Sequence, residues 1–315
     1  MIVRESILRD LLRLFVWFPL RWLIIILPVR WGIAVLQTMG DIHYKFSRGK
    51  KKLLGKNLPL LGDYDAKDKN ESQIIREYFR NHYVDHLMIF LFPKLGIREI
   101  ERFIEIVGLE YLNEALKNGK GVVLVHAHFG PVHLPLVVLA RLGYKMKQIG
   151  LPSDEGLSWI GRNVAFKLRI KYEARMPTEI IKADSFLRGA FKWLGDNGII
   201  MITGDGSGTE KRLGRYEIFE FFGQQVFFPL GPAILTQKTG ANLLPIFITP
   251  GENSYLYRII IERSLISHSE DRDWASNITG QFIKILENYI SEYPWYMHFL
   301  DRFCIGGLIV NEHNK

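Results

Sequence analysis

Two histidines stand in a short turn after an apolar run, a pattern typical of a catalytic base at the end of a strand. The run Val122–Val125 leads into His126, and His128 follows before Gly130 and Pro131. Histidine exchanges protons near neutral pH, so it is the usual general base in enzymes. The turn is therefore a candidate active site, and the alternative is a pair of histidines that only support the fold.

A third histidine, His133, lies five positions after His128. On one ideal helix, five residues at about 100° each would leave the two side chains some 140° apart, too far to face one substrate. They converge only if His128 leaves a strand and His133 begins a helix. Pro131 and Pro135 favour such a late helix start. The spacing permits convergence without requiring it.

A second polar cluster follows the next predicted strand, in the sequence GIIMITGDGSGTEKRLGR. Asp205 stands at the strand exit between Gly204 and Gly206, and these glycines let the backbone approach a ligand closely. Such amide-rich turns with nearby cations suit phosphate or an oxyanion. No nucleotide-binding glycine motif is present, so the pattern is only a weak signature of a nucleotide site. An ordinary surface turn is the alternative. The cations are Lys211, Arg212 and Arg215.

Two phenylalanine pairs, Phe221–Phe222 and Phe227–Phe228, flank a Gly/Gln turn and could border a groove for an alkyl chain. Core packing is the alternative. Near the C-terminus, YPWYMHFLDRF contains Trp295, His298 and Arg302, which suit a membrane interface, an anionic group or an aromatic-capped core helix.

The elements that must position these residues alternate between strand and helix patterns. This alternation predicts an α/β fold, a mixed and mostly parallel sheet flanked by helices on both faces. We expect strands at 122–125, 144–149, 198–203, 243–248 and 259–265, and helices at 74–92, 108–119, 134–142, 186–195, 231–240 and 274–293.

The chain has 315 residues and a net charge of +8. A basic chain fits an anionic membrane surface or acidic soluble partners. It carries no zinc-finger spacing and no RNA-binding signature, so we expect no nucleic-acid partner. Its single cysteine, Cys304, excludes an intramolecular disulfide.

The N-terminal run Leu14–Val29 is strongly apolar but contains Arg21 and two prolines. A spanning helix needs about 20 apolar residues, and cations flank this run on both sides. We predict a membrane-associated helical segment at 1–60, lying in the interface or forming a short anchor, followed by an α/β domain at 61–315. A helical hairpin buried on the domain is the alternative.

Together these segments resemble the bacterial lipid A biosynthesis acyltransferase family, within the lysophospholipid acyltransferase superfamily. The resemblance covers nearly the whole chain. It rests on the apolar N-terminus with LPVRWGIAVLQTMGDIHYK, KNL, the Gly121–Pro131 turn, GIIMITGDG, the block FFG…PLGPAILTQKTGANLLPIF, and YPWYMHFLDRF.

The resemblance implies transfer of a fatty acyl group from acyl-carrier protein or acyl-CoA to a hydroxyl of a membrane glycolipid, such as a lipid A precursor, or of a lysolipid. It implies no metal or bound cofactor, and a place on the cytoplasmic face of the bacterial inner membrane. The family pairs a catalytic histidine with an acidic residue five positions later. His128 matches the histidine, but His133 occupies the acidic position.

Three accounts of this departure remain open: an acid from elsewhere, Asp205 or Glu210, replaces the missing one; a weaker His–His pair works; or the chain only binds lipid. The resemblance also implies substrate binding by residues of these turns: Gly130, Gly204, Gly206, Glu210, Arg212, Arg215 and Phe222. A different lysolipid or phosphoglycolipid acceptor is the alternative within enzymes. A hydrolase is disfavoured, since no GxSxG motif is present.

Overall fold

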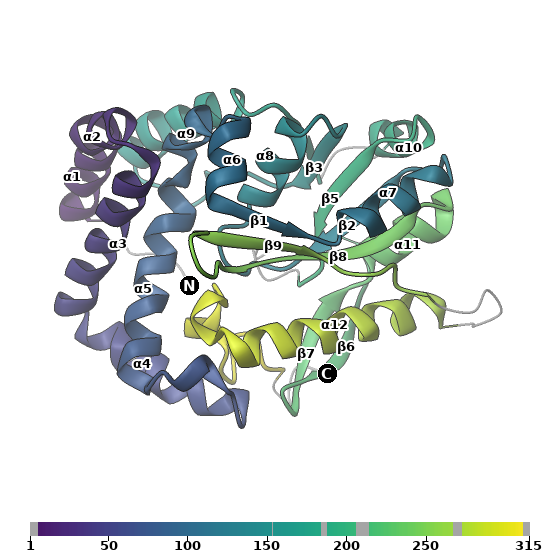
Figure 1. Cartoon of the computed structure of the whole chain (residues 1–315). Coiled ribbons are helices and arrows are strands. Elements are labelled where there is room, and N and C mark those ends of the chain that lie inside the picture. The colour runs from purple at the N-terminus through teal and green to yellow at the C-terminus, as the bar shows by residue number, and fades with distance from the viewer. Residues whose placement is uncertain (1–5, 153, 184–187, 206–213, 267–272, 311–315) are drawn as a thin grey trace.

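The computed structural model describes residues 6–152, 154–183, 188–205, 214–266 and 273–310 (Figure 1). Seven strands form one sheet in the order β1-β9-β8-β2-β5-β3-β4, and β6 and β7 form a separate hairpin. The strands are β1 (Ile104–Val107), β2 (Val122–His126), β3 (Met146–Gly150), β4 (Glu179–Lys182), β5 (Ile199–Thr203), β6 (Tyr216–Phe221), β7 (Gln224–Pro229), β8 (Asn242–Pro250) and β9 (Tyr257–Ile261).

Strand β2 lies at the centre of the sheet and runs parallel to both neighbours, β5 and β8. All five of its residues are buried, as expected for a parallel strand covered on both faces. In the register, His126 is opposite Thr203. The turns that follow β2 and β5 therefore leave the sheet side by side.

Helices cover both faces of the sheet; Figure 1 shows α6 and α8 above it and α12 below it. Alternate residues of β2 enter two different cores, Val122 and Leu124 in one and Val123 and Val125 in the other. The helices are α1 (Ile7–Phe15), α2 (Arg21–Ile26), α3 (Val29–Phe46), α4 (Arg48–Asn57), α5 (Glu71–Leu87), α6 (Ile97–Phe103), α7 (Leu109–Lys117), α8 (Leu134–Arg141), α9 (Lys167–Glu173), α10 (Arg188–Gly195), α11 (Gly231–Thr239) and α12 (Trp274–Glu292).

The predicted mixed, mostly parallel sheet flanked by helices is confirmed. The five predicted strands correspond to β2, β3, β5, β8 and β9, although β9 already ends at Ile261. Sequence patterns missed β1 and β4, which are edge strands of only four residues each. They also missed the β6–β7 hairpin, whose two strands pair from Tyr216–Pro229 to Phe221–Gln224 around the Gly/Gln turn.

The N-terminal apolar run is interrupted at Leu27 and Pro28, where the backbone is extended. Before this break, α1 continues through a π-helical turn at Val16–Leu20, which contains Pro19, into α2. Within the described part of the chain, no helix combines the length and apolarity needed to cross a bilayer. Trp17 and Ile24 pack into the same core as one face of the sheet, so this segment contributes to the globular fold. Its membrane association and the boundary at residue 60 remain predictions.

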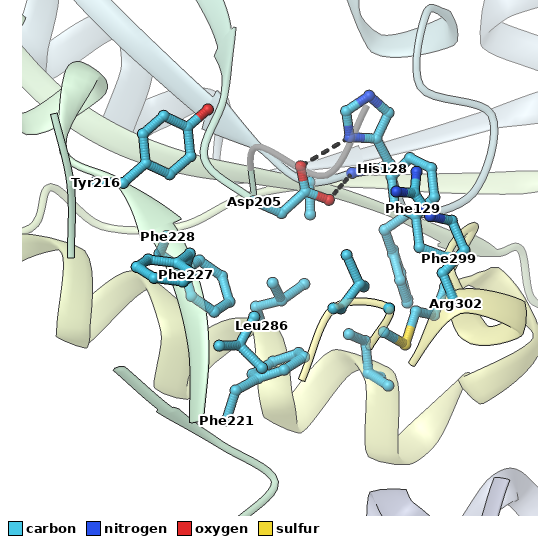
Figure 2. Close-up of a pocket in the computed structure, with 16 residues that line it drawn as sticks. His128, Phe129, Asp205, Tyr216, Phe221, Phe227, Phe228, Leu286, Phe299 and Arg302 are labelled. Carbon is cyan, nitrogen blue, oxygen red and sulfur yellow. Dashed lines mark hydrogen bonds and ion pairs between the residues drawn. The ribbon is translucent and has the colours of Figure 1, made fainter. Parts of the chain in front are cut away.

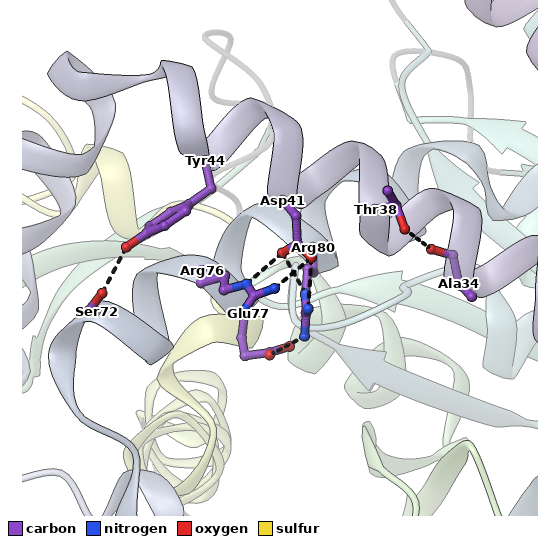
Figure 3. Close-up of polar contacts among 8 residues, drawn as sticks. All are labelled: Ala34, Thr38, Asp41, Tyr44, Ser72, Arg76, Glu77 and Arg80. Carbon is purple, nitrogen blue, oxygen red and sulfur yellow. Dashed lines mark hydrogen bonds and ion pairs between the residues drawn. The ribbon is translucent and has the colours of Figure 1, made fainter.

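Helices α3 and α5 are joined by ionic contacts (Figure 3). Asp41 of α3 accepts hydrogen bonds from Arg76 and Arg80 of α5, at 2.7–2.8 Å. One residue earlier, a Cβ on Gly40 would lie 2.6 Å from the Arg80 Cα. Glycine at this position therefore allows the two helices to approach closely enough for the ionic contacts.

Candidate active site

The turns after β2 and β5 bring His128 and Asp205 together (Figure 2). One carboxylate oxygen of Asp205 lies 2.7 Å from the Nδ1 atom of His128. The other oxygen accepts the backbone N–H of His128, also at 2.7 Å. A single carboxylate thus fixes both the ring and the backbone of the histidine.

Each member of the His128–Asp205 pair shifts the pKa of the other. Burial lowers the pKa of the His128 imidazole, but the charge and hydrogen bond of Asp205, together with the charge of Asp85, outweigh burial, so the net pKa is raised above 6.5. Burial likewise raises the pKa of the Asp205 carboxyl, yet His128 lowers it more, and the net pKa falls below its ordinary value. Asp205 therefore remains ionised, and its hydrogen bond assigns the proton of the neutral imidazole to Nδ1. Nε2 is then left as the basic nitrogen.

His133 lies apart from this pair. It precedes α8, and its Nδ1 atom lies 3.1 Å from the Oε1 atom of Gln148. In the described residues no hydrogen bond or ion pair connects His133 with His128. Burial lowers the pKa of His133 and the nearby Asp85 charge only partly offsets this. Among the three accounts of the missing acid, the geometry favours replacement by Asp205.

Asp85 and His298 support the backbone of the turn. Asp85 accepts the N–H of Val132 at 3.0 Å. His298 places its Nε2 atom 2.7 Å from the carbonyl oxygen of Gly130 and donates its backbone N–H to the carbonyl of His128 at 3.0 Å. Sequence reasoning assigned no role to Asp85 and considered the segment of His298 only for a membrane interface, an anionic group or an aromatic-capped core helix. Neither contact leaves a local sequence signal, because the partners are far apart in the chain.

His126 is buried in surroundings typical of a residue that supports the fold. Burial lowers its pKa to about 3, so it is neutral at physiological pH. Its Nδ1 atom contacts the carbonyl of Ala127 at 3.1 Å, and its Nε2 atom is fully enclosed without a partner in the described structure. His126 therefore cannot exchange protons with a substrate as His128 can.

A cavity of about 170 Å³ opens beside the His128–Asp205 pair. Figure 2 shows aromatic and aliphatic side chains on its far side, including Phe227, Phe228 and Leu286. Phe221 and Arg302 also contribute to the lining. The prediction that the phenylalanine-rich segment borders a groove thus agrees with the geometry, and the β6–β7 hairpin is what positions it.

Two residues expected to bind substrate, Phe222 and Arg215, do not line the described cavity, and their contact with substrate stays a prediction. Phe222 lies in the hairpin turn, where it packs on Phe221 and Phe303 and its N–H reaches Glu287. Arg215 is exposed and ion-paired with Glu217. Arg302, unlike Arg215, is a cation among the lining residues of the cavity.

The predicted glycines have packing roles. A Cβ on Gly130, which has φ +63°, would lie 2.8 Å from Ile248 and Tyr296. On Gly204 it would lie 2.6 Å from Val125 and Phe282. Both glycines let the two turns approach the core; their contact with substrate stays a prediction. Gly206, Glu210 and Arg212 lie outside the described residues.

This arrangement can deprotonate a hydroxyl next to an apolar chain. A neutral imidazole held by a carboxylate is a general base, and a positioned base contributes about 10²–10⁴ in rate. The adjacent phenylalanines offer an apolar surface. Among the described residues, no group of three or more His, Cys, Asp or Glu side chains is arranged to hold a metal ion.

Comparison with known protein families identifies a match. The model of a family described as bacterial lipid A biosynthesis acyltransferase matches residues 5–304. No curated protein sequence matches the chain.

Proposed function

Since the chain belongs to the bacterial lipid A biosynthesis acyltransferase family, we propose that it transfers a fatty acyl group from acyl-carrier protein or acyl-CoA to a hydroxyl of a membrane glycolipid. The observation that carries this proposal is the 2.7 Å contact between His128 and Asp205 at the edge of an apolar cavity. It supplies a carboxylate-held base although His133 occupies the acidic position of the family pattern.

In the proposed reaction, the Nε2 atom of His128 removes the proton of the acceptor hydroxyl. The oxygen then attacks the thioester carbonyl, the carbon–sulfur bond breaks, and the departing thiolate takes the proton from the His128 imidazolium. Asp205 stabilises this cation throughout. The products are an ester and a free thiol.

The apolar side chains of the cavity give the acyl chain a place to bind. Phe221, Phe228 and Leu286 are almost fully buried, and they line the cavity from within the packed core. An alkyl chain that contacts them gains about 0.8 kcal/mol for each methylene removed from water. Arg302 places a cation at the same cavity, where it suits an anionic part of donor or acceptor.

Attachment to a membrane is the second part of the proposal. Large apolar side chains remain exposed along α1, α2 and α3, and contiguous exposed patches of this kind are typical of interaction surfaces. Trp22 and Trp31 are among them, and Arg21 lies over the Trp22 ring at 4.7 Å. Tryptophan beside arginine suits the headgroup region of a bilayer. We propose that this face rests on the cytoplasmic side of the inner membrane.

The decisive experiment compares the wild type with His128→Ala, using labelled acyl-carrier-protein and CoA donors and a mixed membrane-lipid acceptor extract. We expect labelled lipid from the wild type and a loss of about 10²–10⁴-fold in the variant, with vesicle binding unchanged. Equal transfer by both proteins would refute the role of His128. Vesicle binding without transfer by the wild type would support a lipid-binding protein instead.

A further inference from the structure

The turn that carries His128 is paired with a segment near the other end of the chain. The backbone N–H of Gly130 donates to the carbonyl of Tyr296 at 2.9 Å. The backbone N–H of His298 donates to the carbonyl of His128 at 3.0 Å. An antiparallel β-bridge lies between these two hydrogen bonds. The position of the histidine turn therefore depends on how the segment 296–298 is held.

Asp85 of α5 contacts both the turn and this segment. Its Oδ1 atom accepts the N–H of Val132, which belongs to the turn, at 3.0 Å. Its Oδ2 atom lies 3.8 Å from the Nδ1 atom of His298. The Nε2 atom of His298 lies 2.7 Å from the carbonyl oxygen of Gly130, which can only accept, so this nitrogen carries a proton and donates it. One carboxylate thus reaches the turn twice, once directly and once through a histidine.

The Asp85 carboxylate is also a buried negative charge. Its side chain is only 9% exposed, and its ion-pair partners among the described residues are two histidines, His86 and His298. Burial raises the pKa of Asp85, but the nearby histidines lower it more, so the carboxylate stays ionised. Burial lowers the pKa of His298 and Asp85 only partly offsets this, so the His298 ring is neutral at neutral pH. The charge of Asp85 is therefore available to act on other groups.

His128 is one of these groups, because its ring centre lies 6.4 Å from that of His298. Burial lowers the pKa of His128, the charge and hydrogen bond of Asp205 raise it, and the charge of Asp85 raises it further. Other titratable groups face Asp85 or His128 from α5, β2, β9, the start of α8 and the C-terminal segment. These groups are His86, His126, Tyr257, His133 and His298.

We propose that Asp85 is a positioning residue for His128 in the proposed reaction. It fixes the turn through Val132 and His298, and its charge acts with that of Asp205 on the imidazolium that forms during transfer. Asp205 binds the ring itself, whereas Asp85 acts through the backbone and through space. Charges in a buried site are poorly screened, so a second carboxylate behind the turn still stabilises the cation. This inference rests on the proposed function.

The variant Asp85→Asn separates the charge from the hydrogen bond. The amide oxygen can still accept the N–H of Val132, so a purely structural role is retained while the negative charge is lost. The readout is an NMR titration of the histidine ring protons in the full chain, with His128→Ala to assign the His128 signal. We expect the His128 midpoint to move to lower pH in Asp85→Asn, because one charge that favours the cation is gone.

Glu77→Gln is the matched control for this titration. It removes a carboxylate from the same helix, but Glu77 binds Arg80 at 2.8 Å. We expect the His128 midpoint to stay in place in this variant. An equal shift in Glu77→Gln and Asp85→Asn would overturn the proposal, because the effect would then come from net charge alone.

Kinetics forms the second arm. Asp85→Asn should lower kcat by about 10- to 100-fold with little change in KM, as expected when a catalytic group is slightly misplaced or less well stabilised. His298→Phe removes the donor to Gly130 and should also lower kcat. His298→Gln should recover part of this loss, because its amide can donate in place of the ring. Equal kcat values for the two His298 variants would overturn the contact through His298.

The proposal is overturned if the His128 midpoint is the same in Asp85→Asn and the wild type. The NMR titration needs no turnover, so the two proposals fail in different ways. Absence of transfer by the wild type refutes the proposed function. Transfer by the wild type with an unmoved midpoint in Asp85→Asn refutes only the role of Asp85.

Discussion

Asp205 holds His128 through both carboxylate oxygens, one at the ring Nδ1 atom and one at the backbone N–H, each at 2.7 Å. The two residues are 77 positions apart in the chain and meet because β2 and β5 are parallel neighbours in the sheet. We propose that this acid at the exit of a neighbouring strand takes the place of the acidic residue that the family pattern puts at the start of the following helix.

Replacing Asp205 by Asn should reduce transfer strongly. The amide cannot stabilise the imidazolium, and it can favour the wrong imidazole tautomer. We expect kcat to fall by about 10²–10⁴-fold with a small change in KM. Steady-state kinetics with one acyl donor at saturating acceptor measures both constants. A loss below about threefold would contradict the role of Asp205.

His133 provides the matched comparison, because its ring contacts Gln148 and not His128. His133→Gln should therefore retain transfer within about tenfold of the wild type, well above Asp205→Asn. The same assay compares the activities of the two variants. If His133→Gln were as inactive as Asp205→Asn, the His–His pair considered from the sequence would be restored as an explanation.

The pH profile should report the coupling of the pair. Only neutral His128 can act as a base, so kcat/KM should rise with pH through the pKa of this residue in the free enzyme. Burial lowers that pKa, but Asp205 and the charge of Asp85 together raise it more, so the midpoint lies above 6.5. Removing the Asp205 charge should move the midpoint to lower pH. A midpoint that does not move in Asp205→Asn would exclude His128 as the titrating base.

Stability should depend on pH through the same two groups. The raised pKa of His128 contributes stability that is fully present below about pH 6.5 and is lost as pH rises through the folded pKa. The lowered pKa of Asp205 contributes stability that is present above about pH 3.9 and is lost as pH falls through its folded pKa. We expect the wild type to exceed Asp205→Asn in melting temperature most near pH 5, and less at pH 8. A difference that grows toward pH 8 would contradict this sign.

The cavity beside the pair should influence acyl-chain preference. Phe227 lines it and is only half-buried, so Phe227→Ala adds space with little risk to folding. Since a methylene in an apolar pocket is worth about 1–3 kcal/mol, the preference for longer over shorter donors should rise by about tenfold. Competition between donors of two acyl-chain lengths measures this preference. Phe191→Ala is the control, because Phe191 lies on α10 and does not line the cavity; an equal shift in both variants would argue against the groove.

The exposed apolar face of the N-terminal helices should carry membrane binding. Leu11 of α1 and Ile26 of α2 are exposed, and burying a side chain of this size contributes about 1.5–3 kcal/mol. Leu11→Glu or Ile26→Glu should weaken binding to anionic vesicles by about tenfold or more. Ile266→Glu is the control, since Ile266 is equally exposed beyond the end of β9. Similar losses in all three variants would mean that the effect comes from charge alone.

The α3–α5 contact gives a prediction about stability alone. Gly40→Ala forces a Cβ against the backbone of Arg80 and should cost about 1–3 kcal/mol, like other overpacked sites. Gly49→Ala in α4 meets nothing within 4 Å and should stabilise by about 0.5–1 kcal/mol. Urea unfolding measures both free energies. A stabilising Gly40→Ala would show that the helices can separate without cost.

The sequence by itself determined the class of fold and the identity of the central strands. The run Val122–Val125 is apolar at every position, as expected of a strand buried on both faces, and periodic apolar helices follow it. It also indicated His128 and Asp205 as residues at strand exits. These features are local, since each depends on residues that are neighbours in the chain.

Only the tertiary structure decided which residues meet. The strand order places β5 next to β2, which selects Asp205 rather than His133 as the partner of His128. The same folding brings Asp85 and His298 to the turn. Strand order and long-range contacts depend on how whole faces of the elements pack together. That packing cannot be predicted from residue types at fixed spacing along the chain.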